Sequence, residues 1–143
     1  MTYDPSGLFD AIRDKLAAAG WRHTLIGEPT DPPAQPTASV MFAGTAITET
    51  TLGTGSGDVT FVVRFYVKGL QEPRAETEKE LARLGILMLE ALSGDYDLGD
   101  SGVRNVRPLL DSTAGYQTIA NVVYRVLDIR VPIFVNDIVS YAR

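Results

Sequence analysis

One segment constrains the fold of this chain more than any other, and it reads DVTFVVRFYVKG from Asp58 to Gly69. Apolar side chains occupy alternate positions here, at residues 59, 61, 63, 65 and 67, and the positions between them include Arg64 and Lys68. Because successive strand residues point to opposite faces, this period of two predicts a strand with one apolar face. The chain therefore needs a sheet, and that face needs other elements to cover it.

Two further segments have the periodicity of amphipathic helices. The first covers residues 5–19, where Asp4-Pro5 is a good start for a helix and Gly20 a good stop. One face of this helix is expected to point inward. Its apolar positions are Leu8, Phe9, Ile12, Leu16 and Ala19.

The second helix is predicted to begin at Pro73 and to end at Ser93. Ile86 and Leu89 lie outside its main apolar stripe, so the C-terminal half is apolar nearly all round. Such a helix is buried on several sides or buries one face against another chain, which makes Ile86 and Leu89 candidate protein contacts. The stripe itself consists of Leu81, Leu84, Met88 and Leu92.

Residues 45–59 are predicted to form a hairpin arm. Its first strand is rich in threonine, which favours a strand that is nevertheless polar. The stretch GTGSG at 53–57 is expected to be a flexible turn that joins this strand to the apolar one. We expect the arm to extend beyond the core and to order against a neighbour's sheet edge. Its candidate contact residues are Thr48, Thr50, Thr51 and Thr54.

The last third of the chain has a long strand pattern over residues 117–131, which predicts one long strand. A strand of this length exceeds the width of most sheets, so it must bend or leave the domain. Pro132 is expected to break its ladder and to leave residues 132–143 as an apolar tail. The candidate contact residues of this tail are Phe134 and Tyr141.

The order of helix, strands, helix and strands predicts an α+β fold. We expect an antiparallel or mixed sheet of about five strands, two helices packed on one face, and the extended hairpin arm. With 143 residues, the chain is expected to be a single domain, 1–143. Four prolines in residues 27–37 predict an extended connector over the surface, and a proline-rich ligand motif is the alternative.

Charge and cysteine content exclude several classes of protein. Thirteen basic against eighteen acidic side chains give a net charge of −5, which argues against binding nucleic acid through its phosphates. The chain has no cysteine, which excludes disulfides and thiol catalysis. We expect no signal peptide and no membrane contact, because the N-terminus is charged and no apolar run approaches ~18 residues.

No set of residues suited to catalysis emerges. His23 is the only histidine and has no partner for nucleophilic chemistry, so a structural or exposed role is expected. Asp95, Asp97 and Asp100 do not fit a calcium loop and are expected to form an acidic turn. The GTGSG stretch lacks the Lys-Ser/Thr end of a phosphate loop. We expect no catalytic residue, no metal and no cofactor.

The order of these segments resembles that of a known family. An amphipathic helix, LFDAIRDKLAAAG, is followed by the proline-punctuated segment, the strand VTFVVRFYVKG, the helix EKELARLGILMLEAL and the strand YQTIANVVYRVLDIRVPI. This layout resembles the tail terminator proteins, also called tail completion or minor tail proteins, of long-tailed bacteriophages of the siphophage type. The likeness covers nearly the whole chain and rests on element order and length. No family motif maps position by position, so no contact residue is transferred.

The resemblance implies a structural virion protein at the head-proximal end of the tail, assembled in the host cytoplasm. Its copies would form a ring, with hexameric symmetry in the family, that caps the tail tube and stops its elongation. The ring would also offer the surface that joins tail to head. The implied partners are further copies of the chain, the major tail tube protein and the head–tail connector protein. DNA would pass through the lumen without being bound, since carboxylates repel phosphate.

Two alternatives stay open. A small α+β domain can be a ligand-binding or regulatory module, in which residues 59–67 and 119–131 would line an apolar cavity. Another head–tail connector protein of the neck would share the assembly logic and differ only in its position in the virion. A stable or tube-bound ring, as opposed to a monomer or dimer, separates the ring protein from the module.

Overall fold

The computed structural model describes residues 3–33, 36–67, 74–93, 103–106, 109 and 111–141, which form two helices and six strands. Helices and strands alternate in groups along the chain, which is typical of an α+β fold. The elements are α1 (Ser6–Ala18), β1 (Thr24–Ile26), β2 (Thr37–Thr51), β3 (Thr54–Val67), α2 (Arg74–Leu92), β4 (Val103–Val106), β5 (Thr113–Ile119) and β6 (Val122–Ser140).

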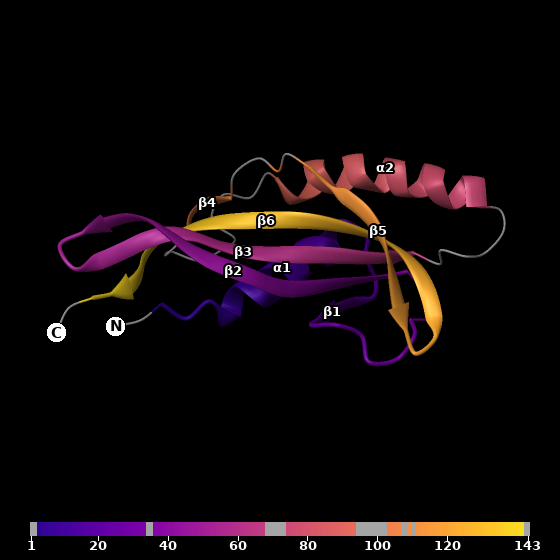
Figure 1. Ribbon diagram of the computed structural model, residues 1–143. Coiled ribbons are helices and arrows are strands. Elements are labelled where there is room, and N and C mark those ends of the chain that lie inside the picture. The colour runs from indigo at the N-terminus through magenta and orange to yellow at the C-terminus, as the bar shows by residue number, and fades with distance from the viewer. Residues whose placement is uncertain are drawn as a thin grey trace.

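The strands form one mixed sheet in the order β1-β2-β3-β6, and β4 and β5 both pair with the other edge of β6. β1 is parallel to β2, and the remaining described pairs are antiparallel. The long hairpin of β2 and β3 extends past both helices at one end of the molecule (Figure 1). The predicted α+β class, with a mixed sheet, two helices and an extended hairpin, is confirmed.

The alternating apolar side chains of β3 face the core, as its sequence predicts. Val59, Phe61, Val63 and Phe65 are each at most 1% exposed, and both helices contribute to the same apolar cluster. Both helices therefore pack on one face of the sheet. The buried helix residues in this cluster are Leu8, Ile12 and Leu16 from α1 and Leu81, Met88 and Leu92 from α2.

α1 begins and ends where the sequence signals lie. Asp4 Oδ1 accepts a hydrogen bond of 3.0 Å from the backbone N–H of Ser6, and this bond lowers the pKa of Asp4. At the other end, Gly20 has φ +102° and its N–H donates to the carbonyl of Ala17 at 3.1 Å. A glycine in this left-handed conformation is a common end of a helix.

The prediction of one strand over residues 117–131 is wrong, because a turn interrupts it. Ala120 and Asn121 have φ of +48° and +68° and join β5 to β6 as a tight hairpin. Two left-handed residues in succession match the twist of the strands they connect, and asparagine adopts this conformation more readily than most residues. The apolar alternation continues on both sides of the turn and so conceals it.

Pro132 does not end its strand. β6 has 19 residues and continues through Pro132, which lies opposite Thr60 of β3. On the outer edge of β6, the ladder with β5 ends at Asp128 and the ladder with β4 begins at Ile133. Pro132 lies in the gap between them, where a residue without an N–H is tolerated. The predicted tail, 132–143, is therefore a sheet strand as far as Ser140.

The proline-rich connector, 27–37, forms neither helix nor strand in its described residues before Thr37. It lies against the face of the sheet opposite the helices. There the hydroxyl of Tyr124 donates a hydrogen bond of 2.8 Å to the carbonyl of Pro33. Tyr124 and Tyr66 meet edge to face beneath it, with ring centroids 6.1 Å apart, in a second small apolar cluster.

Candidate functional site

The arm has three strands where two were expected. Beyond the helices, the start of β3 pairs with β2 on one side and with the end of β6 on the other. Gly55 thus lies between Thr50 of β2 and Val139 of β6. A central strand with partners on both sides is held by two ladders, so the arm is already ordered in the single chain.

The predicted flexible turn at 53–57 is wrong. The turn consists of Leu52 and Gly53, with φ of +46° and +87°, and residues 54–57 belong to β3. Gly55 and Gly57 are buried in the sheet, where close neighbours require the missing side chain. Gly55 and Gly57 therefore allow the close packing of the strands. Of the three glycines in this stretch, Gly53 is the one that takes part in the turn, together with Leu52.

Further contacts fasten the arm to both ends of the described chain. The backbone N–H of Tyr141 donates to the carbonyl of Gly53, and that of Tyr3 donates to the carbonyl of Ile138 at 3.2 Å. Asp137, at φ +54°, bulges out of β6, and its N–H donates to Ser56 Oγ at 2.9 Å. These bonds make the tip of the arm a fixed surface.

The predicted threonine contacts lie on the arm. Thr48, Thr50 and Thr51 are exposed on the distal part of β2. Thr54 is partly buried, because its hydroxyl donates a hydrogen bond of 2.9 Å to the carbonyl of Thr51 across the turn. The structure thus places three of these residues on β2 and the fourth, Thr54, at the start of β3 across the turn, and the three on β2 are open to a partner.

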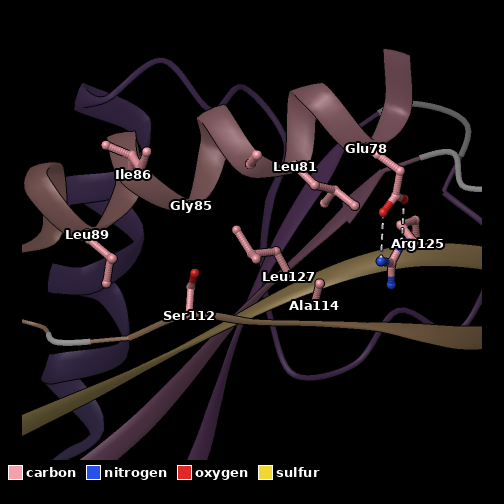
Figure 2. Close-up of a pocket in the computed structure, with 10 residues that line it drawn as sticks. Glu78, Leu81, Gly85, Ile86, Leu89, Ser112, Ala114, Arg125 and Leu127 are labelled. Atoms are coloured by element: carbon pink, nitrogen blue, oxygen red, sulfur yellow. Dashed lines mark hydrogen bonds and ion pairs between the residues drawn. The ribbon is translucent and has the colours of Figure 1, made fainter. Parts of the chain in front are cut away.

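The exposed apolar residues of α2 form a second accessible surface. Ile86 is 69% exposed and Leu87 58% exposed, whereas Leu89 is partly buried. The C-terminal half of α2 is therefore apolar beyond what its own core needs. Ile86 and Leu89 also line a groove of about 270 Å³ between α2 and the pair of strands β5 and β6 (Figure 2).

A charged pair stands at one end of this groove. Arg125 of β6 donates hydrogen bonds of 2.8 and 3.0 Å to the two carboxylate oxygens of Glu78 on α2 (Figure 2). The bonds lower the pKa of Glu78 and raise the pKa of Arg125. The guanidinium also donates to the carbonyl of Gly115 at 2.9 Å and lies 4.5 Å from the ring centroid of Tyr116. Arg125 thus ties α2 to the edge strand β5.

The two contact residues predicted for the C-terminal tail differ. Tyr141 is 50% exposed, and its ring lies over Gly55 on the arm. Phe134 is only 3% exposed, because residue 134 lies within β6, so its prediction as a surface contact is wrong. We therefore retain Tyr141 and omit Phe134.

A polar cluster on the face opposite the helices was not predicted from the sequence. Arg64 of β3 donates hydrogen bonds of 2.7 and 2.9 Å to both carboxylate oxygens of Asp128 on β6, and a third of 3.1 Å to Gln117. The bonds with Asp128 raise the pKa of Arg64, and burial raises the pKa of Tyr66 beside it. The sequence shows Arg64 and Asp128 as charged residues within two apolar strands. It does not show that they form a pair, because the pairing depends on the register of β3 and β6.

His23 and the GTGSG stretch are the candidates for chemistry that lie within the described ranges. His23 is exposed, and its backbone carbonyl accepts a hydrogen bond from Ala38 at 2.9 Å. Asp95, Asp97 and Asp100 lie outside the described residues. Within the described ranges, no three histidine, aspartate or glutamate side chains gather as a metal site would require. None of the helices in these ranges is long and apolar enough to cross a membrane.

Comparison of the sequence with protein-family models and with curated proteins finds no match. A proposal for the function must therefore rest on the sequence and structure of this chain. Its notable surfaces are an ordered arm with an exposed threonine strand and a partly apolar helix beside a groove. Surfaces of these kinds suit contact with other protein chains.

Proposed function

We propose that this chain is a structural virion protein of the tail terminator type. It caps the end of a phage tail tube as a ring, stops elongation of the tube and provides the surface for joining the head. The observation that supports this proposal best is the arm. In its β2 strand every residue from Thr45 to Thr51 except Ile47 is exposed, which is understandable if a neighbour covers this strand.

The surfaces divide naturally between the expected partners. The arm, with Thr48, Thr50 and Thr51 exposed, offers hydroxyls and a strand edge to the tube or to the next copy. The exposed Ile86 and Leu87 offer apolar area of the kind found in the core of a protein interface. A head-to-tail contact between such unlike surfaces closes into a ring when its rotation divides a full turn.

The net charge of −5 suits a protein that surrounds DNA without holding it. An acidic lumen repels phosphate and lets the duplex slide through. Specificity between ring, tube and connector then comes from complementary shape and charge.

Tube assembly tests the proposal. Purified chain is added to polymerising tail tube protein, and tube lengths and end structures are measured by electron microscopy. We expect a cap at one end of each tube and shorter, more uniform tubes. The double variant Thr48→Lys/Thr50→Lys should lose this effect, because docking would have to remove water from two charged side chains on the contact strand. The control Ala17→Lys/Ala18→Lys adds the same charge to exposed positions of α1 and should act like the wild type.

A folded wild-type chain that associates with tube ends under no condition would contradict the proposal. Binding to the connector protein without binding to tubes would indicate a neck protein instead.

The groove beside α2 favours the second candidate, a small ligand-binding module. Its lining joins apolar side chains to the charged pair of Glu78 and Arg125, a combination found in ligand sites. Native mass spectrometry separates the two candidates. A stoichiometric small molecule on a monomer that caps no tubes would support the module.

A further inference from the structure

The outward face of α2 carries two apolar side chains between two opposite charges. Arg83, Ile86, Leu87 and Glu90 are all exposed, and the exposed fractions of Ile86 and Leu87 are 69% and 58%. The core residues of α2 lie on the other side of the helix, against the sheet. In Figure 1 α2 lies along the outside of the molecule, so this face is open to a partner.

The spacing of these residues gives the charges and the apolar pair a common centre. Arg83 and Glu90 are seven residues apart, which is nearly two helical turns, so they lie on one line along the helix with their Cα atoms ~10 Å apart. Successive residues of a helix are rotated by ~100°, which places Ile86 and Leu87 on the two sides of this line. The midpoint between the two charges is therefore also the midpoint between Ile86 and Leu87.

Neither charge has an ion-pair partner within the described part of the chain. The ion pairs in these ranges include Glu76 with Lys79 on the same helix, at 3.7 Å, but none with Arg83 or Glu90. An exposed apolar surface indicates a protein contact. With an unpaired cation at one end and an unpaired anion at the other, this surface favours a partner that carries its charges in the reverse order.

A second copy of α2 has that reverse order when it lies antiparallel to the first. A two-fold axis through the common midpoint brings Arg83 of each copy opposite Glu90 of the other, so two ion pairs form together. The same axis places Ile86 against Ile86 and Leu87 against Leu87, on the two sides of the line of contact. A parallel pair in register would instead bring Arg83 against Arg83 and Glu90 against Glu90, which like-charge repulsion opposes.

We propose that two copies of the chain associate through α2 as an antiparallel, two-fold symmetric dimer. Ile86 and Leu87 form the apolar centre of the contact, and a pair of Arg83 with Glu90 lies at each end of it. A contact of this kind stops at two copies, because each copy uses the same surface that it meets. With one helix from each copy, the contact is smaller than a permanent interface, so the dimer is weak and reversible.

The consequence of this dimer for assembly rests on the proposed function. Ile86 and Leu87 also offer the apolar area that would meet the next copy in a ring. In the dimer these side chains are covered, so free copies are kept from closing into rings away from a tube. Docking on a tube then requires the dimer to dissociate, which makes the dimer a resting form of the chain.

Charge reversal tests the pairing across the two-fold axis. Arg83→Glu and Glu90→Arg each place like charges opposite one another at both ends of the dimer, so each should raise the dissociation constant about tenfold or more. In an equimolar mixture, a copy with Arg83→Glu meets a copy with Glu90→Arg through opposite charges at both ends. The mixture should therefore recover the association of the wild type. Sedimentation equilibrium over a wide range of concentration, at low salt, measures all four samples.

Two further variants separate the contact from general effects of charge and folding. Arg130→Glu makes the same change of charge at an exposed position opposite Val62, on the face of the sheet away from the helices, and should dimerise like the wild type. Ile86→Ser/Leu87→Ser removes the apolar centre and should abolish the dimer. Circular dichroism verifies that every variant is folded.

A wild-type chain that sediments as a monomer at every concentration overturns the proposed dimer. A mixture of the two charge variants that associates no better than either alone overturns the antiparallel pairing. The resting role predicts that Arg83→Glu caps tubes at a lower concentration than the wild type, and equal concentrations overturn that role. The expected dimer in a chain that caps no tubes leaves this contact standing and contradicts the proposed function. Capping by a chain that is always monomeric does the reverse.

Discussion

Replacing Gly57 with alanine should damage the arm severely. A Cβ at Gly57 would lie 1.9 Å from the carbonyl oxygen of Ala46 and 2.9 Å from the Cα of Ile47. Both are backbone atoms of β2, so neither can move aside by rotating a side chain. Gly57 also pairs with Val135 of β6 on its other side, which prevents it from retreating freely. The added methyl group must push β2 and β3 apart.

The cost follows from the size of this displacement. Carbon and oxygen atoms without a bond between them stay more than ~3 Å apart, so the strands must separate by at least ~1 Å. A shift of this size breaks two or three hydrogen bonds of the arm at ~1 kcal/mol each, and overpacking adds ~1–3 kcal/mol. We expect a loss of ~3–6 kcal/mol from a total stability of ~5–15 kcal/mol. In a chain of this length the melting temperature should fall by ~10 °C or more.

Two other glycines provide a graded comparison. A Cβ at Gly55 would meet the side chains of Ile47 at 2.9 Å and Tyr141 at 3.1 Å, which can yield, so Gly55→Ala should cost only ~1–2 kcal/mol. Gly7, within α1, has no atom within 4 Å of such a Cβ, so Gly7→Ala should stabilise by ~0.5–1 kcal/mol. Thermal unfolding followed by circular dichroism gives the order. A Gly57→Ala protein with the wild-type midpoint and unchanged hydrogen-exchange protection in the arm would refute this reasoning.

Three further substitutions test the polar contacts. Tyr66→Phe should change the free energy of unfolding in urea by less than ~1 kcal/mol, because the buried hydroxyl lies beside the Arg64 guanidinium but makes no well-formed hydrogen bond among the described residues. Asp128→Asn should lower it by ~1–3 kcal/mol, since Arg64 loses a charged partner in a half-buried setting. Arg125 lowers the pKa of Glu78, so this stabilisation is complete above the ordinary glutamate pKa and disappears as pH falls through the lowered value. The melting temperatures of wild type and Glu78→Gln should therefore differ at neutral pH and converge in acid.

The elements that the sequence predicts well are those with local signals. α1 has a carboxylate that accepts a hydrogen bond from its first N–H, a periodic apolar face and a glycine that follows its end, all within one short segment. β3 has a period of two that needs no partner to be recognised. Since both helices and the sheet need an apolar face covered, the α+β architecture follows from these segments together.

The errors concern residues whose meaning depends on distant strands. Gly55 and Gly57 have the composition of a loop, but they are required by the approach of β2 and Tyr141. Pro132 reads as a strand breaker, and it is tolerated because two separate partner strands leave a gap beside it. The need for glycine at residues 55 and 57 and the tolerance of Pro132 can be predicted only when the neighbouring strands are known.

The candidate contact surface divides in the same way. Exposed threonines on β2 were predictable, because a polar strand beside an apolar one must show its side chains to solvent or to a partner. The groove was not predictable, because it forms only where α2 approaches β5. Its charged pair, Glu78 and Arg125, joins residues that are 47 positions apart in the sequence. Phe42 lies opposite the core residue Phe61 and is nevertheless 54% exposed, and no local signal in the sequence indicates this.

The order of the arm changes how its docking should work. A loose, glycine-tipped loop would lose conformational entropy on binding at ~1–2 kcal/mol per residue, which weakens any contact it makes. In this chain the tip is closed by a two-residue turn, paired on both sides of β3 and bonded to Tyr141. That entropy is already lost on folding, so a neighbour meets a rigid edge. The strength of association should then depend on side-chain fit at the exposed positions Thr48, Thr50 and Thr51. Variants that loosen the tip should weaken assembly even where they leave these contact residues in place.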